Sequence, residues 1–549
     1  METISLRNID ERKINANIAL HQSIDKNETK QKPIKRSKIK KLKNFFRKTH
    51  RWVGLLVSIL VLNFAISGIV LEHRNFFSHI DIPRSWLPTD YHYANWNNVA
   101  VKGVIALNSQ DNLIYGNIGI WKEKNHNFFD FNKGFEKGAD NRNISTLIKT
   151  TKGNLYAGSL FAFFYFNENT QSWERIKLPT EEQRVVKIIE QDCNLLVMTR
   201  SHIIKMEDKG KNSKFNIVDL KPPVGYKKET SLFQTFWQIH NGEVFGFAGR
   251  LFVDFLGLVF IFLTVTGLIK WYFPKTFKKL TNQKLKLAFF KKINLYSLHW
   301  HNKIGLWTVL FLVISTITGM FLRPPLLILI AESNVPQMKG THLSQDNSWY
   351  DKLRNITFDK TNKNYIFATE ESLYTVDENF ASSPVKYEYQ PPVSVMGVNV
   401  LESRDDGGIL VGSFNGLFLW YPNTNEIFDY VTKQTYTPVE VAGPPVGAFK
   451  VSGYSKLQNG LEYYFDYDMG SVPLNSDKFF ESMPKEIKGK SNISLWNTAL
   501  EFHTARIFKA LVSDFYILII PLSGLLILFT LLSGLIVWLF FYKGKVLIK

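Results

Sequence analysis

Four long apolar runs stand out along this chain, and the polar residues collect between them. The runs cover residues 53–71, 252–269, 304–322 and 515–541, and Asp254 is the one charged residue inside them. A helix that rises about 1.5 Å per residue needs roughly 20 residues to cross a hydrocarbon core of about 30 Å. Soluble core helices rarely run this long without charges, so each run predicts a transmembrane helix.

The two segments between the paired runs alternate short β-prone stretches with Gly, Asn and Asp turns. A loose unit, a polar turn followed by an apolar stretch, recurs about every 40 residues, which is the length of one β-propeller blade. These copies could form one propeller, two partial sheets or a generic β-sandwich. They lie at 111–116, 152–158, 191–197, 363–368 and 407–417, with a less regular copy at 457–464.

The pattern therefore predicts a membrane α + β protein, in which a four-helix transmembrane bundle from a tandem duplication carries two β-rich, propeller-like insertions. The second and fourth helices are expected to extend beyond the membrane on the side of the insertions. The expected segments are a basic segment at 1–50, transmembrane helices at 51–73, 240–273, 304–323 and 503–542, β-rich segments at 74–239 and 324–502, a basic loop at 274–303 and a tail at 543–549.

Lysine and arginine are concentrated beside the predicted helices. Residues 30–51 contain 11 of them and no acid, the loop at 274–303 contains 8 and no acid, and the tail after Tyr542 contains 3. Together they exceed the formal net charge of +19, so the rest of the chain is close to neutral. Because Lys and Arg favour the cytoplasmic side, both termini and the central loop are predicted in the cytoplasm, with the β-rich segments in the periplasm. Topology and anionic lipid explain the charge, and nucleic acid is not an expected partner.

Histidine and glycine positions repeat between the first and third helices. His50 precedes one Gly by four residues and a second Gly by 18, and His301 has the same two spacings. The second Gly follows Ser or Thr in both helices. The matched residues are His50, Gly54, Ser67 and Gly68 in the first half, and His301, Gly305, Thr318 and Gly319 in the second half.

The second and fourth helices repeat in another way. Each contains a Ser/Thr-Gly pair, and a histidine precedes the Gly by 27 residues in the first half and by 31 in the second. One such pair is common in membrane helices, where small residues allow close approach, but four matched sets indicate a duplication in parallel topology. The matched residues are His240, Thr266 and Gly267, and His503, Ser533 and Gly534.

The four matched histidines are candidate haem ligands. A haem b within a membrane needs two neutral imidazoles from different helices, and small residues that let the macrocycle approach the backbone. In the predicted topology His50 and His301 lie at the cytoplasmic face and form the inner pair, whereas His240 and His503 lie at the opposite face and form the outer pair. The alternative is that these histidines only hydrogen-bond lipid headgroups. His299 and His73 are the substitutes if one of the four is misassigned.

Geometry raises an objection to two haem sites. A straight extension of the second helix would put His240 roughly 15 Å beyond the hydrocarbon core. The two candidate sites would then be far apart, and a third carrier or intervening aromatic side chains would be needed between them.

The remaining sequence offers no second cofactor site. The single Cys193 excludes an internal disulfide, and there is no C-x-x-C-H, iron–sulfur cysteine set, G-x-G-x-x-G or P-loop pattern. The β-rich segments show no catalytic motif. Trp86, Trp96 and Trp349 could contact a ligand, although core packing is the expected use.

Three motifs surround the matched histidines and the Ser/Thr-Gly pairs. They are 50–54 with Ser67-Gly68, His240 with 242–246 and Thr266-Gly267, and His503-Thr504 with 506–508 and Ser533-Gly534. In these motifs the transmembrane part resembles the PepSY-associated transmembrane family of bacterial inner-membrane proteins. The resemblance implies two haem b groups with His50, His301, His240 and His503 as ligands, and a role in iron uptake, because some members are similar to dihaem reductases of ferric siderophores. The β-rich segments are larger than in the family and show no PepSY module.

The first hypothesis is an inner-membrane haem b protein that takes electrons from a cytoplasmic or quinol donor and reduces a periplasmic ferric siderophore complex. The second is a non-enzymatic sensor or scaffold whose propeller-like part binds a partner. Transport is a third, weaker option, because Asp254 and Asp514 are the few charges near the spans.

Overall fold

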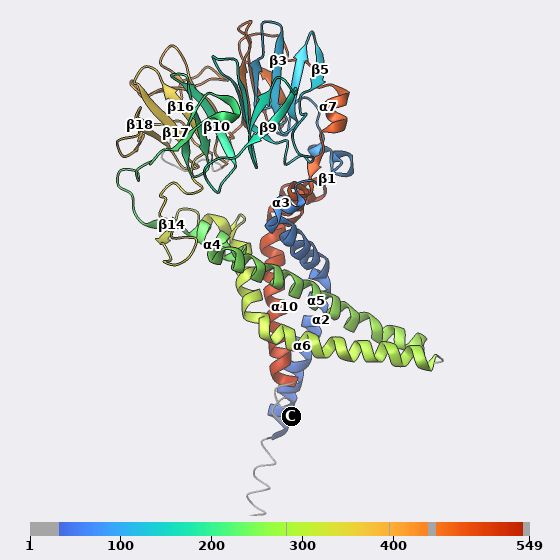
Figure 1. Cartoon of the computed structure of the whole chain (residues 1–549). Coiled ribbons are helices and arrows are strands. Elements are labelled where there is room, and N and C mark those ends of the chain that lie inside the picture. Colours follow the sequence, from blue (N-terminus) through green and yellow to red (C-terminus); the bar gives the residue numbers. More distant parts are fainter. Residues whose placement is uncertain (1–31, 281–282, 395, 438–445, 542–549) are drawn as a thin grey trace, which may run out of the picture. The chain divides into compact units, whose positions relative to one another are not determined.

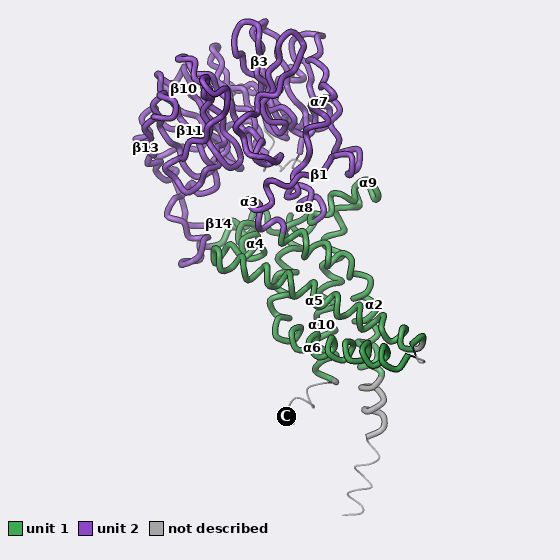
Figure 2. The backbone as a smooth tube through the Cα atoms, turned by 45° about the vertical axis from the view of Figure 1, so that its right-hand side comes forward, with its two compact units in different colours: residues 1–69, 231–335, 503–549 green, residues 70–230, 336–502 purple. Residues whose placement is uncertain are grey.

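The computed structural model describes residues 32–280, 283–394, 396–437 and 446–541, which form two compact units. The membrane unit contains residues up to Ile69, Ser231–Val335 and the residues from His503 onward, and the propeller unit contains Val70–Thr230 and Pro336–Phe502 (Figure 2). Residues 1–31 of the predicted basic segment, and the predicted tail, lie outside the described residues. Both units are therefore assembled from segments that are distant in sequence.

The membrane unit is built on helices α2 (Lys32–Glu72), α5 (Gly246–Lys279), α6 (Lys284–Phe321) and α10 (Ile519–Phe541). In the described part of the chain, four helical stretches are long and apolar enough to cross a membrane, one at each predicted run. Helices α5 and α6 lie side by side as a long hairpin (Figure 1). Helix α2 takes in part of the predicted basic segment, and α5 and α6 take in most of the predicted loop at 274–303.

The predicted extension of the second helix is a separate element. Helix α4 (Leu232–His240) ends before Gly242, whose φ of 79° and whose position against the backbone of Gly249 leave no space for a Cβ atom. The chain therefore turns between α4 and α5, and α4 packs on α6. The region before α10 is also broken. Its elements are α8 (Leu495–His503), η6 (Arg506–Phe508), α9 (Lys509–Val512) and η7 (Ser513–Leu518), while η4 (Glu243–Phe245) precedes α5 and η5 (Leu326–Leu329) follows α6.

Among the described residues of the propeller unit, six separate antiparallel sheets are each formed from strands consecutive in sequence. Their first strands contact one another in the closed order β2, β6, β10, β16, β20, β24 and back to β2, so they surround one axis. Three sheets come from each insertion. The β-sandwich and the two partial sheets are therefore excluded, and both insertions build a single six-bladed propeller (Figure 1).

The blades have the following strands. Blade 1 is β2 (Gly103–Ala106), β3 (Asp111–Gly116), β4 (Gly119–Lys124) and β5 (Asn127–Asp130); blade 2 is β6 (Ile144–Lys149), β7 (Leu155–Ser159), β8 (Phe163–Asn167) and β9 (Ser172–Ile176); blade 3 is β10 (Val185–Gln191), β11 (Asn194–Thr199), β12 (Ile203–Glu207) and β13 (Phe215–Ile217). Blade 4 is β16 (Asn355–Asp359), β17 (Asn364–Ala368), β18 (Leu373–Asp377) and β19 (Val385–Lys386); blade 5 is β20 (Val398–Ser403), β21 (Ile409–Ser413), β22 (Gly416–Tyr421) and β23 (Glu426–Asp429); blade 6 is β24 (Val451–Lys456), β25 (Glu462–Asp466) and β26 (Gly470–Pro473).

Smaller elements surround the blades. Strands β1 (Asp81–Ile82) and β27 (Ile493–Ser494) pair with each other, as do β14 (Glu229–Ser231) and β15 (Asn334–Pro336). The short helices are α3 (Arg74–Phe77), η1 (Arg84–Trp86), η2 (Thr89–Tyr91), η3 (Gly210–Asn212) and α7 (Lys485–Lys490).

Every copy of the predicted repeat unit contains or leads into the second strand of a blade, including the less regular copy at 457–464, which leads into β25. Apolar residues of neighbouring blades meet in these strands and form the core between blades. The ring closes where Ser455 of blade 6 accepts a hydrogen bond from the Val104 amide of blade 1 at 2.6 Å. Trp96 and Trp349 are buried in the core, as expected, whereas Trp86 is 76% exposed.

Candidate functional site

The four matched histidines come together in two pairs within the membrane unit. The ring centroids of His50 and His301 are 6.3 Å apart, and those of His240 and His503 are 6.1 Å apart. Within each pair the two side chains come from different halves of the duplication. The structure therefore has the inner and outer pairs that the repeat predicts.

Each imidazole lies on the Ser/Thr-Gly pair of a helix from the other half. A Cβ atom added to the glycine would meet the Cε1 atom of the imidazole, at distances of 2.6 to 3.8 Å. At Gly319 and Gly534, where these distances are 2.6 and 2.9 Å, the absence of a side chain makes room for the ring, whereas at Gly68 and Gly267 the distances of 3.4 and 3.8 Å are ordinary contacts. His50 lies on Gly534 of α10, His301 on Gly267 of α5, His240 on Gly319 of α6 and His503 on Gly68 of α2.

A backbone carbonyl holds the Nδ1 atom of each ring. The carbonyl belongs to the residue three positions before the Ser or Thr, where it lies one turn below the glycine. The Nδ1–O distances are 2.9 Å for His50 with Thr530, 3.0 Å for His240 with Ser315 and 3.1 Å for His503 with Phe64, and Leu263 is the corresponding partner of His301.

The hydroxyl of the Ser/Thr-Gly pair also faces Nδ1. Each hydroxyl donates to a carbonyl of its own helix, so toward the imidazole it can only accept. The hydroxyl-to-Nδ1 distances are 3.4 Å for Ser533 with His50, 2.8 Å for Thr266 with His301, 3.4 Å for Thr318 with His240 and 3.0 Å for Ser67 with His503.

These contacts determine the tautomer of every ring. A carbonyl and an accepting hydroxyl both require a proton on Nδ1, which leaves Nε2 of a neutral imidazole without a proton. An Nδ1–H group that donates to a backbone carbonyl is the usual arrangement behind a histidine that binds a metal through Nε2. All four rings are thus in the ligand-competent form.

The inner pair borders a cavity of about 720 Å³ in the membrane unit. This volume is in the range of cofactor sites, roughly 300–1,000 Å³. Gly54 and Gly305, each one turn after a histidine of the pair, and Trp271 and Trp538 contribute matching parts of the wall. The cations on the wall all come from the first half. They are Arg47, Lys48, Arg51 and Lys270, and the residues at the matched positions of the second half are Leu298, His299, Asn302 and Val537.

The outer pair packs against an aromatic side chain. The ring of Phe64 is 5.9 Å from that of His503, in an edge-to-face arrangement. Burial lowers the pKa of His240. Burial, and then the charge of His240 and of Arg323, lowers the pKa of His503 to about 3. Both rings are therefore neutral at physiological pH, as metal ligands must be.

The residues of each pair fit haem. Two imidazoles that bind one metal ion from opposite sides, at metal–nitrogen distances of about 2.0 Å, have ring centroids about 6.3 Å apart. No group of three or more His, Cys, Asp or Glu side chains that could hold a metal ion occurs among the residues that the structure describes. Two protein ligands alone leave most metal coordination incomplete, but they suffice for haem iron, whose other four ligands are the porphyrin nitrogens. The inner pair adds small residues, a cavity and one-sided positive charge that suits propionates.

The substitute residues do not join either pair. His299 is exposed and its ring meets Trp300 of the same helix, with centroids 5.8 Å apart, and His73 precedes α3 in the propeller unit. The sequence pattern predicts only close helix approach at the Ser/Thr-Gly pairs, so their role as acceptors for the imidazoles was missed. The sequence did contain a signal for this role. On α2 and on α6 the Ser/Thr-Gly pair lies at the opposite end of the helix from the histidine of that helix, so it is placed to receive a histidine from another helix.

A duplicated four-helix membrane protein with an inserted propeller is the class that this architecture defines. The family model described as the PepSY-associated TM region matches residues 18–273 and again 224–540, so the chain belongs to the PepSY-associated TM family. The first match contains α2, the first β-rich segment and most of α5, and the second contains α5, α6, the second β-rich segment and nearly all of α10. A model that matches the chain twice agrees with the duplication. No curated protein matches the chain.

Several solved structures are similar to this chain at low identity. The extracellular domain of a protein described as a hybrid two-component system from B. thetaiotaomicron is 10% identical, with a TM-score of 0.35, over 69% of this chain and 33% of its own. The GH74 xyloglucanase of Xanthomonas campestris is 10% identical, with a TM-score of 0.33, over 70% and 46%. PorZ of the Porphyromonas gingivalis type-IX secretion system is 10% identical, with a TM-score of 0.32, over 68% and 38%. The chain thus spans a third to a half of the length of these proteins.

Proposed function

We propose that this protein is a haem b electron carrier of the bacterial inner membrane that reduces a ferric complex, of the siderophore type, on the periplasmic side. The observation that carries the proposal is the presence of two cross-half imidazole pairs, each with Nδ1 held by a helix carbonyl and with ring spacings of 6.3 and 6.1 Å. Membership of the PepSY-associated TM family supports a membrane role.

The proposed ligands are His50 and His301 for an inner haem b, and His240 and His503 for an outer one. Haem b would supply a one-electron iron couple at each face. The chain's own contribution is to fix the imidazole tautomers and to bury the pairs among apolar helices. Arg47, Arg51 and Lys270 on the cavity wall would supply counter-charges for propionates.

Aromatic side chains lie between the two pairs. Phe260 lines the inner cavity, and Phe64 contacts the ring of His503. Both phenylalanines pack on one apolar cluster with Val57, Val61 and Ile527. This cluster would provide the intervening aromatic side chains that the distance between the two sites requires. In addition, the turn at Gly242 brings His240 back onto α6, so that His240 does not lie on a straight extension of the second helix. A cytoplasmic or quinol donor remains the proposed source of electrons.

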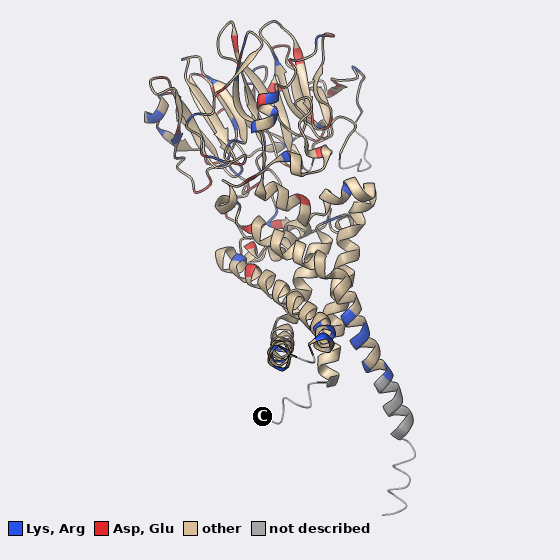
Figure 3. Ribbon diagram, turned by 90° about the vertical axis from the view of Figure 1, so that its right-hand side faces the viewer, with Lys and Arg blue, Asp and Glu red and all other residues tan. Residues whose placement is uncertain are grey.

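Positive charge supports the proposed orientation. Lys and Arg gather on α2 within residues 41–51 and on the ends of α5 and α6 that are nearest in sequence (Figure 3). Since such residues favour the cytoplasmic side, we place these ends in the cytoplasm, with both termini, and the propeller in the periplasm.

A difference spectrum tests the proposal. The purified protein is expected to show reduced-minus-oxidised Soret and α bands of a b-type haem, with two haem groups per chain by pyridine haemochrome assay. The proposal would be refuted if protein purified from cells supplied with a haem precursor lacked these bands. A sensor or scaffold, in contrast, would keep its function when His301 or His503 is replaced by Ala.

A further inference from the structure

One end of the propeller axis is lined by cations. The inner strands of all blades run side by side around the axis, so the residues that immediately precede them meet at the same end. In four of the six blades this residue is Lys or Arg. The six residues, in blade order, are Lys102, Asn143, Arg184, Arg354, Gly397 and Lys450.

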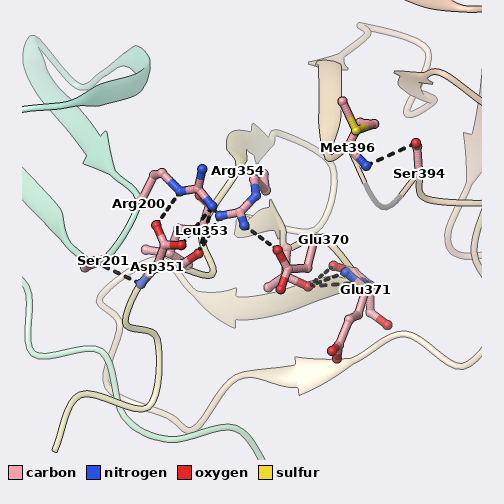
Figure 4. Close-up of polar contacts among 11 residues, drawn as sticks. Arg200, Ser201, Asp351, Leu353, Arg354, Glu370, Glu371, Ser394 and Met396 are labelled. Atoms are coloured by element: carbon pink, nitrogen blue, oxygen red, sulfur yellow. Dashed lines mark hydrogen bonds and ion pairs between the residues drawn. The ribbon is translucent and has the colours of Figure 1, made fainter. Parts of the chain in front are cut away.

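A further arginine joins this end from a hairpin turn. Arg200 lies between β11 and β12, next to Thr199, which pairs with Val185 at the start of β10. The guanidinium groups of Arg200 and Arg354 lie beside each other (Figure 4), and both donate to the backbone carbonyl of Asp351, at 3.2 and 2.7 Å. Two positive groups from neighbouring blades are thus held in contact with one acceptor.

Some of these cations have carboxylate partners. Arg200 pairs with Asp351 at 2.6 Å, Arg354 with Glu370, and Lys450 with Asp468. Arg74, which also faces this end, pairs with Asp140 at 2.7 Å. The carboxylate of Glu182 accepts a hydrogen bond from the backbone amide of Arg200 at 3.3 Å. Each of these four cations therefore has a carboxylate that balances its charge.

Lys102 and Arg184 differ from the others. Lys102 donates to the neutral amide of Asn143 at 2.7 Å, and within the described residues no carboxylate forms an ion pair with either cation. Burial, and then repulsion from Arg184 and Arg74, lowers the pKa of Lys102 to about 7. Burial, and then repulsion from Arg200, lowers the pKa of Arg184 to about 10. Both side chains nevertheless keep part of their surface in contact with solvent.

Lys102 and Arg184 therefore lie at the same end of the axis. They belong to blades 1 and 3, which are not neighbours, and blade 2 contributes Asn143 between them. Partly buried cations without counter-charges are unfavourable unless a ligand neutralises them. Guanidinium groups bind carboxylate and phosphate oxygens through paired hydrogen bonds, and an ammonium adds a point charge.

We propose that this end of the propeller axis binds a small multivalent oxyanion, held by Lys102 and Arg184 and flanked by Arg200 and Arg354. The shared chemistry is two or more carboxylate or phosphate oxygens on a compact molecule. The inference stands independently of haem, because all its residues lie in the propeller unit.

Isothermal titration of the full-length protein in detergent tests this site. Citrate represents the carboxylate source and inorganic phosphate the phosphate source, each titrated at an ionic strength held constant with sodium chloride. One of them is expected to bind saturably, and Lys102→Gln and Arg184→Gln should each weaken that binding by at least about tenfold, since a hydrogen bond to a charged group is lost. The anion that binds more tightly shows whether the site prefers carboxylate or phosphate oxygens.

Arg175→Gln is the matched control, because Arg175 is 49% exposed on β9, the strand of blade 2 that lies farthest from the axis. There it makes a long ion pair of 3.7 Å with Glu136 and donates to the backbone carbonyl of Phe161 at 3.2 Å. It should bind the anion as the parent does. The two test variants should melt no earlier than the parent without anion, because they relieve repulsion, which separates loss of binding from loss of folding. Absence of saturable binding of both anions, or equal weakening by Arg175→Gln, would overturn the proposal.

Discussion

The inner pair is carried by helices that run through the membrane unit without a break, whereas the outer pair is carried by short helices that end at the histidine itself. His50 and His301 lie within α2 and α6, but His240 and His503 are the last residues of α4 and α8. The ring spacings are nevertheless almost equal, at 6.3 and 6.1 Å. The comparison teaches that the Ser/Thr-Gly pair on the receiving helix, rather than the backbone that carries the histidine, sets the geometry.

A second contrast cuts across both faces. The imidazoles of the first half, His50 and His240, lie tightly on glycine, with 2.9 and 2.6 Å between the added Cβ and Cε1. Those of the second half, His301 and His503, lie more loosely, at 3.8 and 3.4 Å, and are closer to the hydroxyl. The duplication has therefore kept the arrangement while the two halves differ in which contact is closest.

The largest effect is expected from removing one ligand at each face. His301→Ala should abolish the inner haem and leave the outer one, and His503→Ala should do the reverse, so each variant keeps about one of two haem groups. Pyridine haemochrome assays give the stoichiometry. His299→Ala is the control, two residues from His301, and should keep both groups. Loss of both haems in either single variant would contradict two separate sites.

Alanine at the receiving glycines tests the tight and loose contacts. Gly319→Ala and Gly534→Ala place a methyl group inside the contact distance of His240 and His50, at a cost of about 1–3 kcal/mol, and should displace the ring and lower haem occupancy at one face. Gly267→Ala meets His301 only at 3.8 Å and should be nearly neutral. Melting temperature and haem content are the measurements. Equal effects at all three positions would rule out the contrast between the halves.

The pH dependence of stability probes the outer pair in protein prepared without haem. The folded state keeps His503 neutral to about pH 3, whereas the unfolded chain binds a proton near pH 6.5. The unfolded state thus binds more protons in this window, so stability is full above about pH 6.5 and falls as the pH is lowered. Between pH 6.5 and 5 the loss at this one site should be about 2 kcal/mol. Thermal unfolding of His503→Ala should show a flatter profile, while His299→Ala should follow the parent.

The smallest effect is expected at the hydroxyls. Thr266→Val removes an acceptor 2.8 Å from Nδ1 of His301, and the lost hydrogen bond should be worth about 1 kcal/mol. We expect this loss to appear as a shift in the midpoint potential of the inner haem. Thr318→Val removes an acceptor 3.4 Å from His240, where the Ser315 carbonyl at 3.0 Å remains, and should shift the outer potential less. Redox titration of both variants decides the order. A larger shift for Thr318→Val would show that the hydroxyl distance is not what matters.

Local periodicity accounts for much of what could be predicted. The apolar runs predict the four spanning helices because a membrane helix needs only a length of apolar sequence. The blade repeat predicts the propeller strands, since each unit such as 407–417 carries its own turn and strand signals. The helix break at Gly242 was not predicted, because a glycine in a polar stretch does not reveal that the next segment folds back onto α6.

The sequence by itself determined the spans, the blade repeat and the matched positions of His50, His301, His240 and His503, because these are regularities of spacing. Only the tertiary structure decided which helix receives each imidazole, that Ser67, Thr266, Thr318 and Ser533 accept from Nδ1, and that the two insertions close one ring. It alone also brought Lys102 and Arg184 to one end of that ring. The physical reason is that these contacts join residues from different helices or blades, and no local pattern records which partner a side chain will meet.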